Sequence, residues 1–194
     1  MADQKLKSII KFLQDAEQLK DTLRSAHTTE GRQESTAEHS WRLCLMVLLF
    51  EEDYADLDIL KLMKICLIHD LGEAVNGDIA AVDQVGAADK NDEERKDLYS
   101  LTSSLPEGPQ HKIMALWDEY DQGSSPEARL AKAFDKLETI LQHNQGNNPA
   151  DFDYGFNLTY GKKHTDLDHL TMKMRQLVDQ DTQRRGGQQK EDRL

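Results

Sequence analysis

The sequence has few cysteines and lacks any long apolar segment, and both shortages restrict where the protein can work. Its two cysteines, Cys44 and Cys66, lie inside apolar segments and form no CxxC pair, so we expect buried free thiols and a reducing compartment. The N-terminal segment MADQKLKSIIKFLQDAEQLKD carries charged residues throughout, unlike a signal peptide. No segment is long and apolar enough to span a membrane. We therefore expect a cytoplasmic protein that does not bind membranes.

Positive charge is also scarce. The chain has 24 lysines and arginines against 36 aspartates and glutamates, a formal net charge of −12. Such a charge repels the phosphate backbone of nucleic acids and the surface of an anionic membrane. This excludes a nucleic-acid polymer as partner, and a small anionic substrate would have to meet a local positive site.

Strand signals are missing, because no stretch alternates strictly between polar and apolar residues over a useful length. Apolar residues recur at helical spacing instead, which predicts an all-α fold, a compact bundle of roughly six to eight helices. With 194 residues, the chain fits one domain over residues 1–182, followed by a polar tail, 183–194, that we expect to be disordered. The predicted helices cover approximately residues 4–23, 37–52, 56–70, 88–105, 110–120, 126–143 and 165–181.

Two segments between the predicted helices are expected to be irregular. Residues 24–38 are predicted to form a loop in which Ser35 or Thr36 could cap the next helix. Residues 144–164 are predicted to form a loop or short helical turns.

A histidine and an aspartate stand side by side at the end of a buried helix, as His69 and Asp70. An ionised carboxylate at such a place is costly unless it has a partner, and a metal ion would supply one. Divalent first-row metals accept imidazole nitrogen and carboxylate oxygen together. His39, His69, Asp70 and Asp135, drawn from three helices, therefore form a candidate ligand set for one Mn, Fe, Co, Ni or Zn ion.

This ligand set calls for a separate general base. Two neutral imidazoles and two carboxylates cancel the formal charge of a divalent ion, so the ion acidifies water less than an all-histidine site does. Glu73 lies about one helical turn after His69, and Asp78 follows the Asn76-Gly77 turn. Both are candidate catalytic carboxylates, and their two roles stay open at this point.

A phosphate ester needs cations in addition to the metal. Lys132 precedes Asp135 by three residues, which places both on one helix face, and Arg24 lies in the segment before His39. Both are candidate substrate-binding residues, although each could equally be an ordinary surface charge. The alternative for Asp135 is a surface ion pair with Arg129 or Lys132.

The motifs around these residues resemble those of the HD-domain phosphohydrolases, and in particular the bacterial 5′-deoxynucleotidases and their relatives. The resemblance rests on EHSW around His39, LIHDLGEAVNGDI from Leu67 to Ile79, and KAFDKLE around Asp135, and it runs from about residue 24 to about residue 143. It implies that His39, His69, Asp70 and Asp135 bind the metal, that Glu73 activates water and Asp78 assists, and that Arg24 and Lys132 contact the substrate phosphate. It also implies a small cytoplasmic enzyme that forms a homodimer.

The resemblance makes removal of the 5′-phosphate from (deoxy)nucleoside monophosphates the expected activity. One departure concerns the sugar, because Ser25 stands where the deoxynucleotidase pattern has a Trp associated with sugar selection. There are two alternatives. The protein could hydrolyse another phosphorylated metabolite or a signalling nucleotide, or it could be a non-catalytic HD-fold module that binds nucleotides. The signalling nucleotide is disfavoured because no Gly-Tyr-Pro motif is present and Glu73 is followed by Ala74.

Residues outside the motifs receive structural interpretations. The remaining histidines of interest, His111, His143, His164 and His169, are interpreted as structural. Trp41 and Trp117 stand among periodic apolar residues, so we expect them in the core or at a subunit interface.

Overall fold

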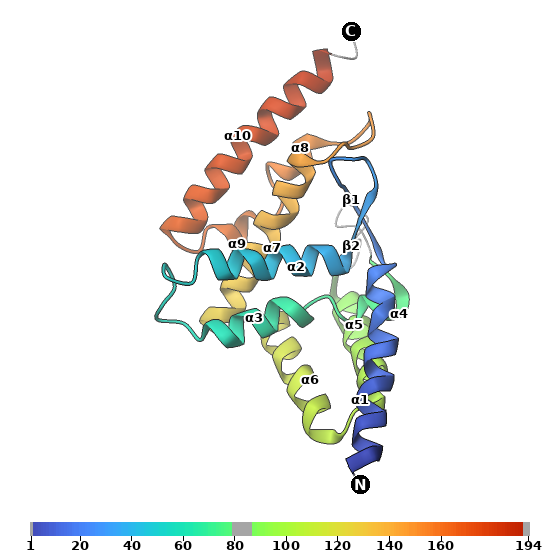
Figure 1. Cartoon of the computed structure of the whole chain (residues 1–194). Helices are drawn as coiled ribbons and strands as arrows, with labels where there is room; N and C mark the ends of the chain where they lie inside the picture. Colours follow the sequence, from blue (N-terminus) through green and yellow to red (C-terminus); the bar gives the residue numbers. More distant parts are fainter. Residues whose placement is uncertain (1, 79–86, 192–194) are drawn as a thin grey trace.

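The computed structural model describes residues 2–78 and 87–191, and these residues form an almost entirely helical fold (Figure 1). The prediction of an all-α class is confirmed. The elements, in chain order, are α1 (Ala2–Ala16), η1 (Glu17–Lys20), β1 (Leu23–His27), β2 (Gln33–Ser35), α2 (Thr36–Leu49), α3 (Ile59–Ile68), α4 (Glu73–Asn76), α5 (Ala87–Leu101), η3 (Thr102–Ser104), α6 (Glu107–Gln122), α7 (Pro126–Gln145), α8 (Tyr154–Asn157), α9 (Lys162–Thr165) and α10 (His169–Glu191).

Helices α2, α3 and α7 enclose the main core, where Leu43, Leu62, Ile65, Phe134 and Leu137 are buried together. Figure 1 shows α2 and α3 lying one above the other, with α7 crossing behind them. Burying these apolar side chains supplies most of the free energy that holds the three helices together. The predicted metal ligands therefore lie on, or directly after, three helices that share one core.

Local capping determines where these helices begin. Ser35 and Glu38 form a capping box at the start of α2, as expected for Ser35. The Asp58 carboxylate accepts a hydrogen bond from the Lys61 backbone N–H at the start of α3. Ser125 caps α7 in the same way, and Pro126 occupies its first turn.

A second buried cluster fixes the end of α3. Leu98, Leu101, Met114 and Trp117 pack there against Ile68. The indole Nε1 of Trp117, which is 3% exposed, donates a hydrogen bond of 3.0 Å to the backbone oxygen of His69. Of the two places predicted for Trp117, core or subunit interface, the structure shows the core, and this contact holds the His-Asp pair in place.

The sequence prediction was wrong about residues 21–35, which were assigned to the end of a helix and a loop. The first helix ends at Ala16, well before residue 23, and the predicted loop contains an antiparallel hairpin in which Leu23 pairs with Ser35. Gly31, with φ 83°, makes the tight turn. Strands this short carry no readable period-two pattern, so only pairing between them reveals the sheet.

Helix α10 continues to Glu191, whereas the sequence predicted a disordered polar tail from residue 183. Arg185 Nε donates to the backbone oxygen of Asn144 at 2.7 Å and its Nη2 donates to that of Gly146 at 2.8 Å, at the end of α7. These bonds to distant carbonyls order a segment whose composition alone favours disorder. Residues 192–194 and Ile79, the last residue of the LIHDLGEAVNGDI motif, lie outside the described residues. In the described part of the chain, no helix has both the length and the apolar composition needed to cross a bilayer.

Candidate metal centre

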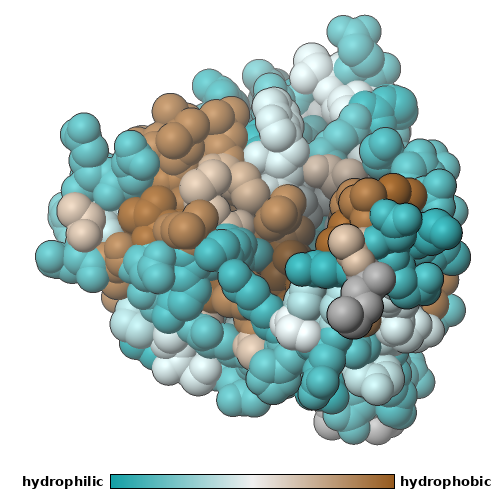
Figure 2. All heavy atoms as spheres, turned by 60° about the horizontal axis from the view of Figure 1, so that its bottom comes forward, coloured by the Kyte–Doolittle hydropathy of each residue, from teal (hydrophilic) through white to brown (hydrophobic). Residues whose placement is uncertain are grey.

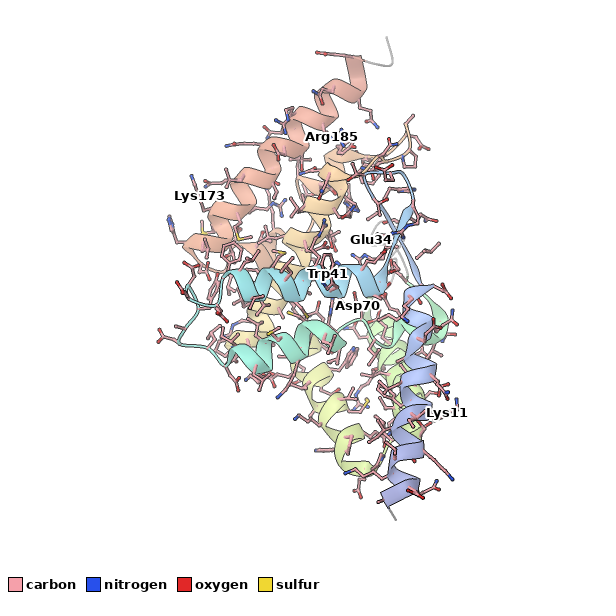
Figure 3. All side chains as sticks on the ribbon, viewed as in Figure 1. Lys11, Glu34, Trp41, Asp70, Lys173 and Arg185 are labelled. Atoms are coloured by element: carbon pink, nitrogen blue, oxygen red, sulfur yellow. The ribbon has the colours of Figure 1, made fainter. Side chains whose placement is uncertain are left out.

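The four predicted metal ligands come together at the centre of the bundle. His39 lies in α2, His69 and Asp70 follow α3, and Asp135 lies in α7. His39 Nε2 lies 3.2 Å from Asp135 Oδ1 and 3.8 Å from Asp70 Oδ2, and His69 Nε2 lies 3.1 Å from Asp70 Oδ2. Figure 3 shows Asp70 at the end of α3, below α2. The sequence spacing therefore identified a set of side chains that the fold does bring together.

One ring nitrogen of each histidine makes no hydrogen bond, although a carboxylate oxygen of a predicted ligand lies close to it. Nε2 of His39 and Nε2 of His69 are both buried and make no hydrogen bond. Buried polar atoms in this condition are costly unless another group binds them. Two imidazole nitrogens beside two carboxylates are a donor set that suits a divalent transition metal. The residues present therefore fit a divalent metal ion.

Hydrogen bonds behind the ligands orient both imidazole rings. His69 Nδ1 donates to the backbone oxygen of Cys66 at 2.9 Å, and His39 Nδ1 faces the Glu138 carboxylate. Arg42 Nε donates to Glu138 Oε1 at 2.6 Å from the other side. Each histidine thus has Nδ1 engaged and Nε2 directed at the centre, the arrangement that metal-binding histidines commonly adopt.

Electrostatics keeps the ligand carboxylates ionised. Burial by itself raises the pKa of Asp70, but the His69 and His39 imidazoles outweigh it and hold that pKa below its ordinary value. Burial also opposes ionisation of Asp135, yet Lys136 and His39 hold the pKa of Asp135 well below its ordinary value. Both aspartates are therefore charged at neutral pH, as metal ligands must be.

A metal ion at this centre would compete with a proton for Nε2 of His39. Burial and the charge of Arg24 lower the pKa of His39, but the carboxylates of Glu138 and Asp135 outweigh both and raise it to about 9. Nδ1 already has Glu138 as its partner, so a second proton would sit on Nε2, the atom that faces the other ligands. Metal binding and protonation at Nε2 therefore exclude each other.

The two candidate catalytic carboxylates lie next to this centre. Glu73, the first residue of α4, is 7% exposed, and its Oε2 accepts a hydrogen bond of 3.0 Å from Thr36 Oγ1. Burial, assisted by the charges of Asp70 and Asp78, raises the pKa of Glu73 to about 10. Asp78 is half-buried beyond Gly77 and close enough to influence both Glu73 and Arg24. A cation at the centre would lower the pKa of Glu73 and favour its basic form.

The predicted substrate cations have different surroundings. Arg24, on β1, lies with Nη1 3.4 Å from Asp70 Oδ2 and Nε 3.5 Å from Glu34 Oε2, while Nη2 donates to Thr139 Oγ1 at 3.1 Å. Lys132 forms no ion pair with any of the four predicted metal ligands. Its ammonium instead lies 4.4 Å from the centroid of the Tyr120 ring.

The lysine that contacts Asp135 is Lys136, with Nζ 2.8 Å from Oδ2. Asp135 is 4% exposed, so its alternative as a surface ion pair with Arg129 or Lys132 is wrong. Sequence reasoning missed both Lys136 and Glu138. The available signal was their place in KAFDKLE, one and three residues after Asp135.

Three residues outside the motifs, His143, His164 and Trp41, differ in how far they are buried. His143 is buried and donates from Nδ1 to Asn157 Oδ1 at 2.9 Å, which agrees with its structural interpretation. His164, on α9, is half-buried, and burial together with the charges of nearby lysines lowers its pKa to about 4. Trp41 is 65% exposed, so it does not belong to the core, which leaves an interface as the remaining interpretation.

A buried His-Asp centre between packed helices defines a class of helical metal-binding proteins. The family model described as "HD domain" matches residues 16–175, and the chain belongs to the HD domain family. The expected family resemblance is thereby confirmed.

Individual relatives agree with this membership. The chain is similar to "5′-deoxynucleotidase HDDC2" of Danio rerio, at 34% identity over 137 residues, 70% of this chain and 68% of the relative. The Bos taurus protein of the same name is 30% identical over 181 residues, 90% of this chain and 87% of the relative. A crystal structure of a "predicted metal-dependent phosphohydrolase" from Magnetospirillum magnetotacticum MS-1 superposes with a TM-score of 0.75 at 29% identity, covering 95% of this chain and 96% of that one.

Proposed function

We propose that this protein is a metal-dependent phosphohydrolase that removes the 5′-phosphate from nucleoside monophosphates. The observation that carries the proposal is the complete set His39, His69, Asp70 and Asp135 converging beside the buried carboxylate of Glu73. Relatives named 5′-deoxynucleotidase, aligned over most of the chain, support the substrate class. A non-catalytic module would be expected to have lost one of these residues, and all are present.

The roles of the residues follow from their chemistry. A divalent ion held by the four ligands supplies a Lewis acid for the phosphate. Glu73 removes the proton from the attacking water, with Thr36 fixing the direction of its carboxylate. Asp78 assists this proton transfer. The guanidinium of Arg24 and the ammonium of Lys132 bind the phosphate oxygens, which carry negative charge in the transition state.

Two features narrow the choice of metal ion and of the sugar in the substrate. Mixed imidazole and carboxylate ligands favour Mn, Fe, Co, Ni or Zn over Mg, which prefers an all-oxygen site. Ser25 is small and exposed on β1, so it presents no bulky side chain against a ribose 2′-hydroxyl. We therefore propose one transition-metal ion per chain and activity on both ribo- and deoxyribonucleoside monophosphates.

The test is phosphate release from a panel of ribo- and deoxyribonucleoside monophosphates, after chelation and after re-addition of each metal in turn. The expected result is release that depends on a transition metal, with both sugars accepted. Wild-type protein that regains its metal but releases no phosphate from any member of the panel would overturn the proposed function. The Asp70→Ala variant is the matched control, because it removes one ligand and should stay inactive with every metal.

We also propose that the protein forms a homodimer through the outer faces of α2 and α3. Figure 2 shows apolar side chains gathered over one broad area of the surface. The exposed apolar residues of the two helices are Trp41, Leu45, Leu48 and Leu49 on α2, and Leu60 and Leu67 on α3. A twofold interface pairs the same patch on both copies. An apolar patch places no like charges opposite each other, although each chain has a net charge of −12. Sedimentation should give a dimer, and Leu48→Glu should give a monomer.

A cytoplasmic location stays a prediction. Cys44 and Cys66 are both free thiols, which agrees with the reducing compartment expected from the sequence.

A further inference from the structure

One short turn of the chain holds both candidate catalytic carboxylates, and this turn packs on α5 (Figure 1). Glu73 begins α4, Asn76 ends it, and Asp78 follows two residues later. At the start of the turn, a Cβ atom on Gly72 would lie 2.8 Å from the backbone oxygen of Glu94, so only glycine permits this close approach to α5. The position of Glu73 beside the metal centre therefore depends on how α4 packs on α5.

Asn76 holds the other end of this turn against α5. Its Nδ2 donates hydrogen bonds of 2.8 Å to both carboxylate oxygens of Asp97. A carboxylate at position 76 would have no hydrogen to donate, and it would face the negative charge of Asp97 at the same short distance. The contact between α4 and α5 at this end therefore requires the amide of Asn76.

The same asparagine is placed where it can lose its amide. Asn76-Gly77 is the only Asn-Gly dipeptide in the sequence. The short asparagine side chain can reach the backbone nitrogen of the next residue, and glycine has no side chain to hinder this approach. Both residues are exposed, and a Cβ atom on Gly77 would meet no atom of the described residues within 4 Å.

One backbone hydrogen bond has to open before this reaction can occur. The Gly77 N–H donates to the Glu73 oxygen at 2.8 Å. This bond closes the last turn of a helix of only four residues, and helix ends open readily. The fold therefore slows the approach of the Gly77 nitrogen to the Asn76 side chain without blocking it.

We propose that Asn76 is a deamidation site, and that its modification releases the turn carrying Glu73 from α5 and lowers the activity of the enzyme. The loss of activity rests on the proposed function, whereas the modification does not. Both products of the reaction, aspartate and isoaspartate, place a negative charge opposite Asp97. Isoaspartate also adds one carbon to the backbone between Glu73 and Asp78.

The reaction consumes only water and releases ammonia. The Gly77 nitrogen gives up its proton and bonds to Cγ of Asn76. The bond between Cγ and Nδ2 breaks, and Nδ2 leaves as ammonia with the proton from the Gly77 nitrogen. Water then opens the resulting succinimide ring at one of its two carbonyl carbons. Opening at Cγ gives aspartate, and opening at the backbone carbonyl gives isoaspartate.

The first test is mass spectrometry of the metal-loaded protein after incubation for increasing times in a mildly alkaline buffer. The deamidated fraction at Asn76 should rise with time and include isoaspartate. Asn91 is the internal control, because it is also exposed and its Nδ2 donates to Asp121 Oδ1 at 2.7 Å, but the residue after it is Asp92. Asn91 should stay unmodified. An unmodified Asn76, or equal modification of Asn91, overturns the inference.

The second test uses Asn76→Asp, which reproduces one product. Its turnover number for nucleoside monophosphate should fall by a factor on the order of 10 to 100, the scale for a misplaced catalytic group, with little change in the Michaelis constant. Asn91→Asp should keep normal turnover, because it makes the same change of charge on α5 away from the turn. Elemental analysis should show equal metal content in both variants, so that the loss reports on Glu73. Normal turnover in Asn76→Asp overturns the inference.

Asn76→Gln links the modification to the loss of activity. Glutamine would have to close a larger ring, so this variant should keep its starting turnover during incubation, while the wild type loses turnover as Asn76 is deamidated. Equal losses in the two proteins overturn the inference.

A wild type that releases no phosphate from any nucleoside monophosphate overturns only the proposed function. Hydrogen exchange of residues 73–77 then decides the inference, because release from α5 exposes these amides. Faster exchange in Asn76→Asp than in wild type supports it, and equal exchange overturns it.

Discussion

His39 and Glu138 form a fully buried pair in which the imidazole Nδ1 contacts the carboxylate, and both side chains are 0% exposed. Burial opposes ionisation of Glu138, but His39 and Arg42 outweigh it and lower the pKa of Glu138. An ionised Glu138 accepts a hydrogen bond from Nδ1–H of His39 and leaves the Nε2 lone pair directed at Asp135 and Asp70. This carboxylate, absent from the predicted ligand set, therefore decides which nitrogen of His39 can bind a metal.

We expect Glu138→Gln to weaken metal binding by about 10- to 100-fold, the usual effect of removing the carboxylate behind a histidine ligand. The amide keeps the shape of the side chain but not the charge that stabilises the Nδ1–H tautomer. Competition with a chelator measures the affinity. Glu127→Gln is the control, since Glu127 is also a buried acid of α7 but pairs with Lys61 at 2.8 Å and should leave metal affinity unchanged. Equal affinities in Glu138→Gln and wild type would contradict the assignment.

Asp70→Ala should lose the metal and with it the rise in melting temperature that the metal produces. Removing this carboxylate leaves His69 Nε2 without its neighbour at 3.1 Å and takes one negative charge from the centre. Elemental analysis and thermal unfolding with and without added metal measure both effects. His164→Ala should keep the metal, because His164 is not among the four side chains that meet at the centre. Loss of metal from His164→Ala would show that the ligand set is wrong.

Glu73→Gln should keep the metal and lower turnover by a factor on the order of 100 or more, the scale for removing a general base. Glutamine retains an oxygen that can accept the hydrogen bond from Thr36, so the local structure should persist. Lys132→Gln provides the contrast, since loss of a phosphate-binding cation should raise the Michaelis constant. Near-normal turnover in Glu73→Gln would move the role of the base to Asp78.

His143 should make the fold sensitive to mild acid. Burial, which outweighs the hydrogen bond to Asn157, lowers the pKa of His143 to about 4 in the folded protein. The unfolded chain, with a histidine pKa of about 6.5, binds more protons between these two values, so the free energy of unfolding falls as the pH drops through this window.

Urea unfolding at about pH 7.5 and about pH 4.5 should show that His143→Gln loses less stability than wild type, by on the order of 2 kcal/mol. Acid strips the metal from both proteins, so the difference between them isolates His143. Equal losses of stability in the two proteins would refute the expectation.

Local patterns in the sequence determined the helices around the centre and the four side chains that meet there. Apolar residues at helical spacing place His39 and His69 on the inward faces of their helices, and Ser35, Asp58 and Ser125 cap the helices that follow. Such signals can be read because they involve residues within one or two turns of each other. The all-helical class follows from the same short-range information.

Only the tertiary structure decided what these elements pair with. The β1–β2 hairpin depends on two strands finding each other, and the last turns of α10 depend on Arg185 reaching the carbonyls at the end of α7. Likewise, Glu138 and Lys136 acquire their roles from His39 and Asp135, and His164 acquires its lysine neighbours only because α9 packs against α7. These contacts join residues far apart in the chain. Their free energy depends on burial and on the distance between the groups, and neither quantity can be read from the sequence.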